Sequence, residues 1–128
     1  MARIINYRDL EVYRLAHELA VEIHRMTISE LPKLEQFEEA CQIRKSAKSI
    51  SVNIVEGFGR RRYKSEYVRF LIFSHASCDE TIEHLFLLKD TCSLKSERAE
   101  YFLSKYDLLG RKISQFIDGV EISHRAQD

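Results

Sequence analysis

The sequence predicts an all-α fold, an antiparallel up-down-up-down four-helix bundle, and three observations support this prediction. Apolar residues recur at alternating spacings of three and four in four segments, as the buried face of a helix requires. The links between these segments are short. The composition is 45% hydrophobic and 31% charged, with one proline and four glycines, which is typical of an α-rich chain. A length of 128 residues indicates one domain.

The four helices are expected at about residues 8–28, 35–56, 64–91 and 96–121 of a single domain that spans residues 1–128. Their apolar stripes are Val12, Ala16, Leu19, Ile23 and Met26; Ala40, Ile43, Ala47, Ile50 and Ile54; Tyr67, Leu71, Ser74, Cys78, Thr81, Leu85 and Leu88; and Phe102, Tyr106, Leu109, Ile113, Phe116 and Val120. Gly57 suits a left-handed residue just after the second helix. Short links make consecutive helices antiparallel neighbours.

The third helix carries more apolar side chains than one core face needs. Phe70, Phe73, Phe86 and Leu87 lie outside its stripe. Large exposed apolar surfaces usually mark interfaces, so we expect a homo-oligomer. The alternative is a helix that is buried deeply within its own bundle.

Basic residues concentrate in the middle of the chain, although the formal net charge is zero. Residues 44–69 hold eight Lys and Arg against two Glu, a local charge of +6, and the segments on either side carry −3 each. A helical wheel places Arg44, Lys45 and Lys48 on the outer face of the second helix. The next helix begins after the loop, and its N-terminus adds partial positive charge.

We predict that these cations form a basic edge that binds RNA or DNA, or a nucleic-acid enzyme, mainly through electrostatic attraction. The residues are Arg44, Lys45, Lys48, Arg60, Arg61, Arg62 and Lys64. The alternative is a protein-only scaffold, in which the basic loop is solvated or contacts acidic groups of a partner or a neighbouring subunit. Asn53, Glu56 and Glu66 are expected to form a structural polar cluster that holds the loop.

Catalysis is not expected, and the alternative enzyme hypothesis depends on one pair of residues. Arg69 and His75 fit the loose spacing of helical ribonucleases that cleave RNA as dimers, in which a histidine acts as general acid or base. Such a pair arises readily by chance in a chain with 20 Lys and Arg and five His. No cofactor is indicated.

No metal site is expected either. Only Glu121 and His124 have the Glu-x-x-His spacing of a di-iron bundle, and His17 and His24 share a helix face as surface histidines. Cys41, Cys78 and Cys92 have no CxxC spacing and are interpreted as free buried thiols. The sequence shows neither an apolar run long enough to cross a bilayer nor a signal peptide, so we expect a cytoplasmic protein without membrane contact.

The segment "QIRKSAKSISVNIVEGFGRRRYKSEYVRFL", residues 42–71, resembles the four-helix-bundle family encoded by intervening sequences in bacterial 23S ribosomal RNA genes. The matching residues are Gln42, Arg44, Ser49, Ile50, Asn53, Ile54, Glu56, Gly57 and Glu66. Leu10, Val12 and Ala16 match the start of the family, with Tyr7 and Tyr13 in place of Phe and Trp.

This resemblance covers most of the chain and implies a ring-like homo-oligomer, commonly a pentamer, without known catalysis. Accessory variability proteins of diversity-generating retroelements look like relatives. They are barrel-shaped pentamers that bind reverse transcriptase and nucleic acid through basic surface.

Overall fold

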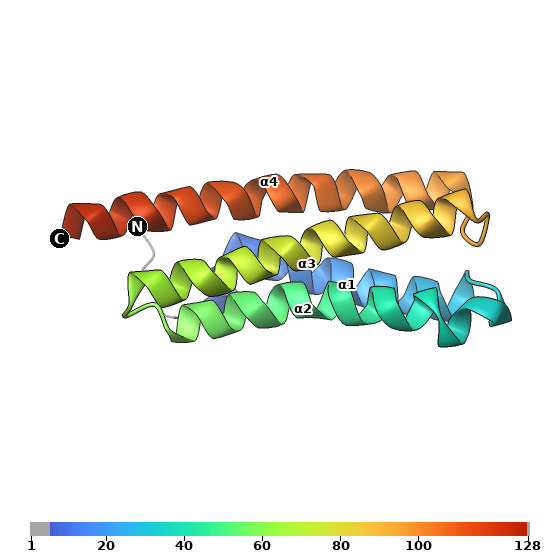
Figure 1. Ribbon diagram of the computed structural model, residues 1–128, viewed down its shortest axis with the longest axis horizontal. Coiled ribbons are helices and arrows are strands. Elements are labelled where there is room, and N and C mark those ends of the chain that lie inside the picture. The colour runs from blue at the N-terminus through green and yellow to red at the C-terminus, as the bar shows by residue number, and fades with distance from the viewer. Residues whose placement is uncertain (1–5, 128) are drawn as a thin grey trace.

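The computed structural model describes residues 6–127, and side chains as far as Ser123. The elements are a 3₁₀ helix η1 (Tyr7–Asp9), α1 (Glu11–Ser29), a 3₁₀ helix η2 (Lys33–Phe37), α2 (Glu39–Gly59), α3 (Lys64–Asp90) and α4 (Ser96–Gln127). Within this range no residue is in a strand. The four long helices lie side by side, and each runs antiparallel to the one before it (Figure 1). The predicted all-α four-helix bundle is confirmed.

The apolar stripes face the core as predicted. Every position of the first three stripes is buried. In α4 all the named positions are buried except Phe116, which is half-buried and packs against the core. Tyr106 and Phe102 are the largest fully buried side chains. The spacing of three and four therefore located the core correctly in each helix.

Helix boundaries differ from the prediction at several ends. Residues 8–10 do not belong to α1, because Asn6 caps η1: its side chain accepts from the Arg8 amide at 2.9 Å, and its own amide donates to Asp9 at 3.2 Å. The start of α2 falls at Glu39 rather than near residue 35, because residues 33–37 form η2. The Glu35 side chain of η2 is held by the Ser93 hydroxyl at 2.6 Å.

The prediction of a left-handed Gly57 after the second helix is wrong. Gly57 is buried inside α2, and no described glycine has a positive φ. A Cβ built at this position would lie 3.2 Å from the Phe70 Cβ and 3.3 Å from the Tyr67 carbonyl oxygen. Glycine therefore suits this position because α2 and α3 approach each other closely here.

Small polar side chains line the rest of the contact between α2 and α3. Ser46 and Thr81 share a buried hydrogen bond of 2.9 Å, and the Ser74 hydroxyl donates to the Ile50 carbonyl at 2.8 Å. The hydroxyls of Ser46, Ser74 and Thr81 thus all have partners, which removes most of the cost of their burial. Small residues let the two helix backbones lie close together.

The cysteines are free, but two of them are not buried as expected. Cys41 and Cys92 are exposed, and only Cys78 is buried. Cys41 lies outside the apolar stripe of α2, and Cys92 lies in the link after α3 with a φ of 60°. Burial raises the pKa of the Cys78 thiol to about 12. None of the described helices is long and apolar enough to span a membrane.

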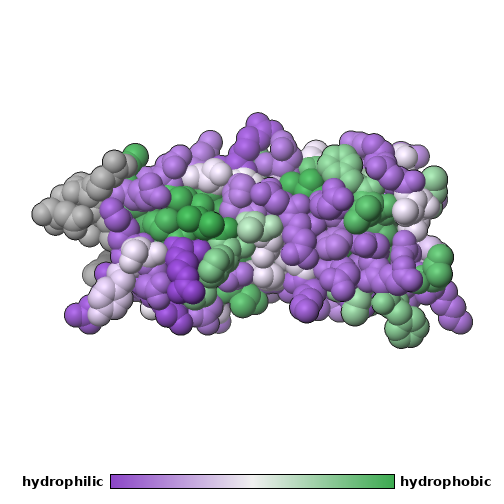
Figure 2. Space-filling view, viewed as in Figure 1, coloured by the Kyte–Doolittle hydropathy of each residue, from purple (hydrophilic) through white to green (hydrophobic). Residues whose placement is uncertain are grey.

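An apolar surface remains on α3 and α4. Ile72, Phe73, Phe86 and Leu87 of α3 are between 38% and 51% exposed, and Leu108 of α4 is 43% exposed. The face that α3 and α4 present in Figure 2 accordingly carries green areas among the purple. The expectation that α3 keeps apolar side chains outside the core is confirmed.

Candidate nucleic-acid interface

The predicted basic residues fall in two regions of the structure. The first is the α2–α3 corner, which comprises the last turn of α2, the link of residues 60–63 and the first turns of α3. The second lies on α2, near Lys48. Twelve residues separate Lys48 from Arg60 along the chain, which corresponds to about 18 Å of helix rise.

Arg60 is paired within the α2–α3 corner. Its guanidinium lies 3.4 Å from the Glu56 carboxylate and 3.3 Å from that of Glu66. Glu66 also pairs with Arg69 at 3.2 Å. The Phe70 ring lies near both guanidinium groups, at 4.8 Å from Arg60 and 5.5 Å from Arg69. These groups form a network that ties α2 to α3, and Arg60 pairs with a carboxylate of each helix within it.

Arg61 is also held in place at this corner. Its carbon Cζ lies 3.9 Å from the centroid of the Phe58 ring, and its Nη1 donates to the Phe58 carbonyl oxygen at 2.9 Å. That carbonyl is one of the last in α2, where a cation is favourable. Arg62 is exposed and lies 5.8 Å from the ring of its neighbour Tyr63. The link therefore presents fewer available cations than its sequence suggests.

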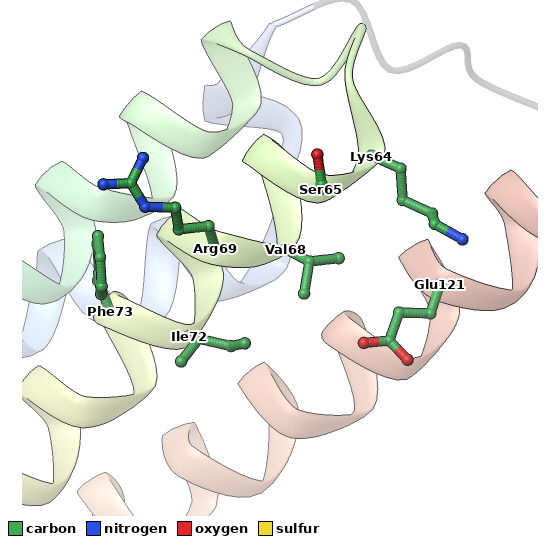
Figure 3. Close-up of a pocket in the computed structure, with 7 residues that line it drawn as sticks. All are labelled: Lys64, Ser65, Val68, Arg69, Ile72, Phe73 and Glu121. Atoms are coloured by element: carbon green, nitrogen blue, oxygen red, sulfur yellow. The ribbon is translucent and has the colours of Figure 1, made fainter.

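Lys64 faces α4 rather than the other cations of the link. It lines an open depression of about 560 Å³, together with Ser65, Val68, Arg69, Ile72, Phe73 and Glu121. In Figure 3 the Lys64 side chain extends toward α4, on the side where Glu121 lies, while Arg69 points away from it. A carboxylate therefore shares this depression with the two cations.

The outer-face prediction is wrong for Arg44. Its side chain is half-buried, and its Nη1 donates to the Thr27 hydroxyl of α1 at 2.9 Å. Arg44 lies beside the apolar stripe of α2 rather than opposite α1. Its side chain is long enough for the guanidinium to reach Thr27 at the contact between α1 and α2. Lys45 and Lys48 are exposed, as predicted.

Lys48 lines a groove between α1 and α2, which we call the α1–α2 groove. Its volume is about 550 Å³. The groove is lined by His17, Ala20, Val21, His24, Arg25, Lys48, Ser51 and Val52. No carboxylate is among these described lining residues, and neither Arg25 nor Lys48 forms an ion pair with a described residue.

Three residues of this groove were missed in the sequence: His17, His24 and Arg25. The spacing of His17 and His24 placed both on one face of α1, but nothing in the local pattern connected that face to Lys48. The local charge of +6 indicated a site within residues 44–69 instead, and α1 lies outside that segment. A wheel of α1 set against that of α2 would have brought the four side chains together.

The predicted polar cluster is divided in the structure. Glu56 and Glu66 both pair with Arg60, and these three residues hold the link. Asn53 does not join them, and its amide donates to the Ser49 carbonyl at 2.9 Å and to the Ser49 hydroxyl at 3.0 Å. Ser49 in turn contacts Ser77 of α3 at 2.9 Å. Asn53 belongs to the polar contact between α2 and α3.

The ribonuclease pair does not share a site. Arg69 lies against Phe70 and Phe73, with its Cζ at 5.5 and 5.4 Å from the two ring centroids. His75 lies 3.5 Å from Asp79 and lines a different depression, between α3 and α4. Within one subunit, the two side chains therefore line different depressions.

The described residues include no group of three or more His, Cys, Asp or Glu placed to hold a metal ion. The structure does not test the pair Glu121 and His124, because the side chain of His124 lies outside the described residues.

Comparison with known proteins identifies the family. The sequence model of the 23S rRNA-intervening sequence protein family matches residues 8–115. The chain belongs to this family. The match includes both the α2–α3 corner and the α1–α2 groove, and it confirms the resemblance that residues 42–71 indicate.

The fold of the chain is also similar to a solved structure from Bacteroides thetaiotaomicron VPI-5482, a protein of unknown function from the S23 ribosomal protein family. The TM-score is 0.76 at 23% sequence identity, and the similarity covers 83% of this chain and 97% of the other. No curated protein matches the chain.

Proposed function

We propose that this protein is a non-enzymatic, cytoplasmic homo-oligomer that binds RNA or DNA through the α1–α2 groove. The observation that supports this proposal best is the charge of the groove. Arg25 and Lys48 lie on a recessed surface whose described lining residues include no carboxylate.

Phosphate is the group that this arrangement suits. An exposed Arg and Lys, with no carboxylate among the described residues that line the groove, attract a polyanion, and binding releases the counterions of the phosphates. The α2–α3 corner is less suited, because Glu56 and Glu66 lie within 3.4 Å of Arg60. We therefore assign nucleic-acid binding to the groove rather than to the corner. Lys48 remains part of the binding surface, and Lys45 lies near it on α2.

Self-association is supported by the apolar side chains on α3 and α4. Leaving Ile72, Phe73 and Phe86 exposed to water is unfavourable in a monomer. A ring, such as the pentamer that the family resemblance implies, would present one groove per subunit to the same strand. Several weak contacts on one strand then combine into a high avidity.

The test is the salt dependence of binding to a fluorescent RNA, measured by anisotropy from about 0.05 to 0.3 M salt. The logarithm of the association constant should fall by about 0.7 per phosphate contacted, per decade of salt, for a single strand. Arg25→Glu with Lys48→Glu should weaken binding by at least about tenfold. The matched control is Lys95→Glu with Lys105→Glu, which makes the same charge change at exposed positions outside the groove and should leave affinity nearly unchanged.

Two results would end this proposal. One is the absence of binding to any RNA or DNA at about 0.05 M salt, and the other is an equal loss of affinity in the groove variant and the control variant. Light scattering of the free protein checks the oligomer separately, because a clean monomer at all concentrations contradicts the self-association.

The second candidate is a protein-only scaffold, and the exposed Arg62 favours it. Arg62 forms no ion pair with a described residue, so it is available to acidic groups on a neighbouring subunit or on a partner, such as a reverse transcriptase or another nucleic-acid enzyme. This candidate predicts that Arg60→Glu with Arg61→Glu breaks the assembly, as seen by light scattering, while RNA binding is absent in every variant.

A further inference from the structure

We propose that the α1–α2 groove binds single-stranded rather than duplex nucleic acid, with bases over its floor and phosphates on Arg25 and Lys48. This inference rests on the proposed function and specifies the form of the ligand. It is supported by the floor of the groove rather than by its charge.

The floor offers surfaces for bases as well as cations for phosphates. Ala20, Val21 and Val52 supply an apolar surface, and Val52 is 58% exposed. His17 and His24 lie on the same side of α1, seven residues apart, or about 10 Å along the helix. Imidazole rings and apolar surfaces are the groups on which unstacked bases lie. The groove thus combines both requirements of a single-strand site.

Aromatic rings continue from the groove toward the start of α1. The centroids of Tyr13 and His17 are 5.6 Å apart, with an angle of 32° between the rings. Tyr13 is also in edge contact with Tyr7 at 4.9 Å. Tyr7 and Tyr13 are half-buried against the core, and the Tyr13 hydroxyl lies 3.4 Å from Nδ1 of His17. Tyr13 thus positions the His17 ring at the edge of the groove.

A duplex would gain little from this surface. Its bases are stacked and paired inside the helix, and a recessed floor meets only the phosphate backbone. A single strand can turn its bases toward Val21 and Val52 while its phosphates contact Arg25 and Lys48. The apolar floor is therefore expected to favour the single strand over the duplex.

The experiment compares three fluorescent probes of about 12 nucleotides, a length within the range of known single-strand sites. They are a single-stranded RNA, the same sequence as a duplex, and an abasic strand with the same number of phosphates. Affinities are measured by anisotropy at about 0.1 M salt. We expect the single strand to bind at least about fivefold more tightly than the abasic strand, and more tightly than the duplex.

Variants of the two histidines test the stacking directly. His17→Ala with His24→Ala should lower the affinity for the single strand toward that for the abasic strand, without changing the latter; the apolar floor retains the remainder of the difference. His17→Tyr with His24→Tyr should restore binding, because tyrosine keeps a ring without the imidazole. Tyr63→Ala is the control, since Tyr63 is an aromatic residue 61% exposed in the α2–α3 link and should not affect binding.

The outcomes separate this inference from the proposed function. If none of the three probes binds, the proposed function fails. If the abasic strand or the duplex binds as tightly as the single strand, the groove binds phosphate alone and this inference is overturned, while the proposed function stands. Retention of full single-strand affinity in the double alanine variant would also overturn it.

Discussion

The α2–α3 corner and the α1–α2 groove are both basic, but their cations are in different environments. In the corner, Arg60 lies within 3.4 Å of two carboxylates, and Arg61 lies on the Phe58 ring. In the groove, Arg25 and Lys48 are exposed and have no ion-pair partner among the described residues. The corner has more cations, but Glu56 and Glu66 lie among them, whereas no carboxylate is among the described residues that line the groove.

The difference shows that the number of cations in a segment does not measure its capacity to bind anions. An arginine that pairs with a carboxylate within its own chain must lose or share that contact before it binds a phosphate. The corner is therefore expected to contribute to stability, and the groove to binding. The following changes test each half of this comparison.

The largest effect on stability is expected at Gly57, where α2 and α3 approach most closely in the corner. Gly57→Val places side-chain atoms against the Phe70 Cβ and the Tyr67 carbonyl, where even a Cβ would lie 3.2 and 3.3 Å away. Such overpacking costs about 1–3 kcal/mol. Urea unfolding followed by circular dichroism should show the loss.

Gly59→Val is the matched control for this change. Nothing lies within 4 Å of a Cβ built at Gly59, so the free energy of unfolding should stay within about 0.5 kcal/mol of the wild type. If both variants lost the same stability, the close approach at Gly57 would not be the cause, and the corner would be less tightly packed than described.

The next effect is a pH dependence at Tyr67, which packs beneath the corner. Burial raises its pKa from 10.0 to about 12, and the charge of Arg61 opposes this shift. Because the raised value belongs to the folded state, stability from this group is complete below about pH 10 and is lost as the pH rises from 10 toward 12. The wild type should lose about 1 kcal/mol more than Tyr67→Phe between pH 10 and 11.

Tyr67→Phe is informative because Cys78 and Tyr106, whose pKa values burial also raises, are retained in both proteins. Their alkaline contribution cancels in the difference between the two unfolding free energies. Identical pH profiles would mean that the Tyr67 hydroxyl is accessible to water, and that the corner is looser than its contacts indicate.

A smaller effect is expected for single arginines of the corner. Arg60→Ala removes the pairs with Glu56 and Glu66, and Arg61→Ala removes the contact with Phe58; each should cost about 0.5–1 kcal/mol. Arg62→Ala should cost less than about 0.5 kcal/mol, since its one described ring contact is with its neighbour Tyr63. Urea unfolding at low salt would measure all three, and equal values would remove the distinction between held and available arginines.

The core of the fold was predictable from sequence because its signal is local. The spacing of three and four identified the buried face of every helix, including the small residues Ser74 and Cys78 of α3. The helix ends were less predictable, because residues 7–9 and 33–37 form 3₁₀ helices that the spacing of apolar residues does not reveal. Gly57 shows the same limit: the glycine was noticed, but its reason lies in Phe70, on another helix.

The candidate site was only partly predictable, because availability of charge depends on contacts between helices. Lys48 was identified, and Arg25 was not, since the groove needs α1 and α2 side by side. Arg44 was placed on the outer face by its position on the helical wheel, but Thr27 of α1 holds its side chain. Such long side chains are positioned by tertiary partners, which the sequence pattern of one helix does not contain.

The central claim is that the groove, and not the corner, binds the ligand, and one comparison of RNA affinities tests it most directly. Arg25→Glu with Lys48→Glu and Arg61→Glu with Arg62→Glu make the same charge change in the two regions. At about 0.1 M salt the screening length is about 10 Å, less than the roughly 18 Å of helix rise between Lys48 and Arg60, so the two regions act separately. Circular dichroism would confirm that both variants are folded. We predict that the affinity of the groove variant falls at least about tenfold. The slope of the logarithm of its association constant against the logarithm of salt concentration should become shallower by about 1.4, or about 0.7 for each of two phosphate contacts. The affinity of the corner variant should stay within about threefold of the wild type. The opposite ranking, with the larger loss in the corner variant, would contradict the account.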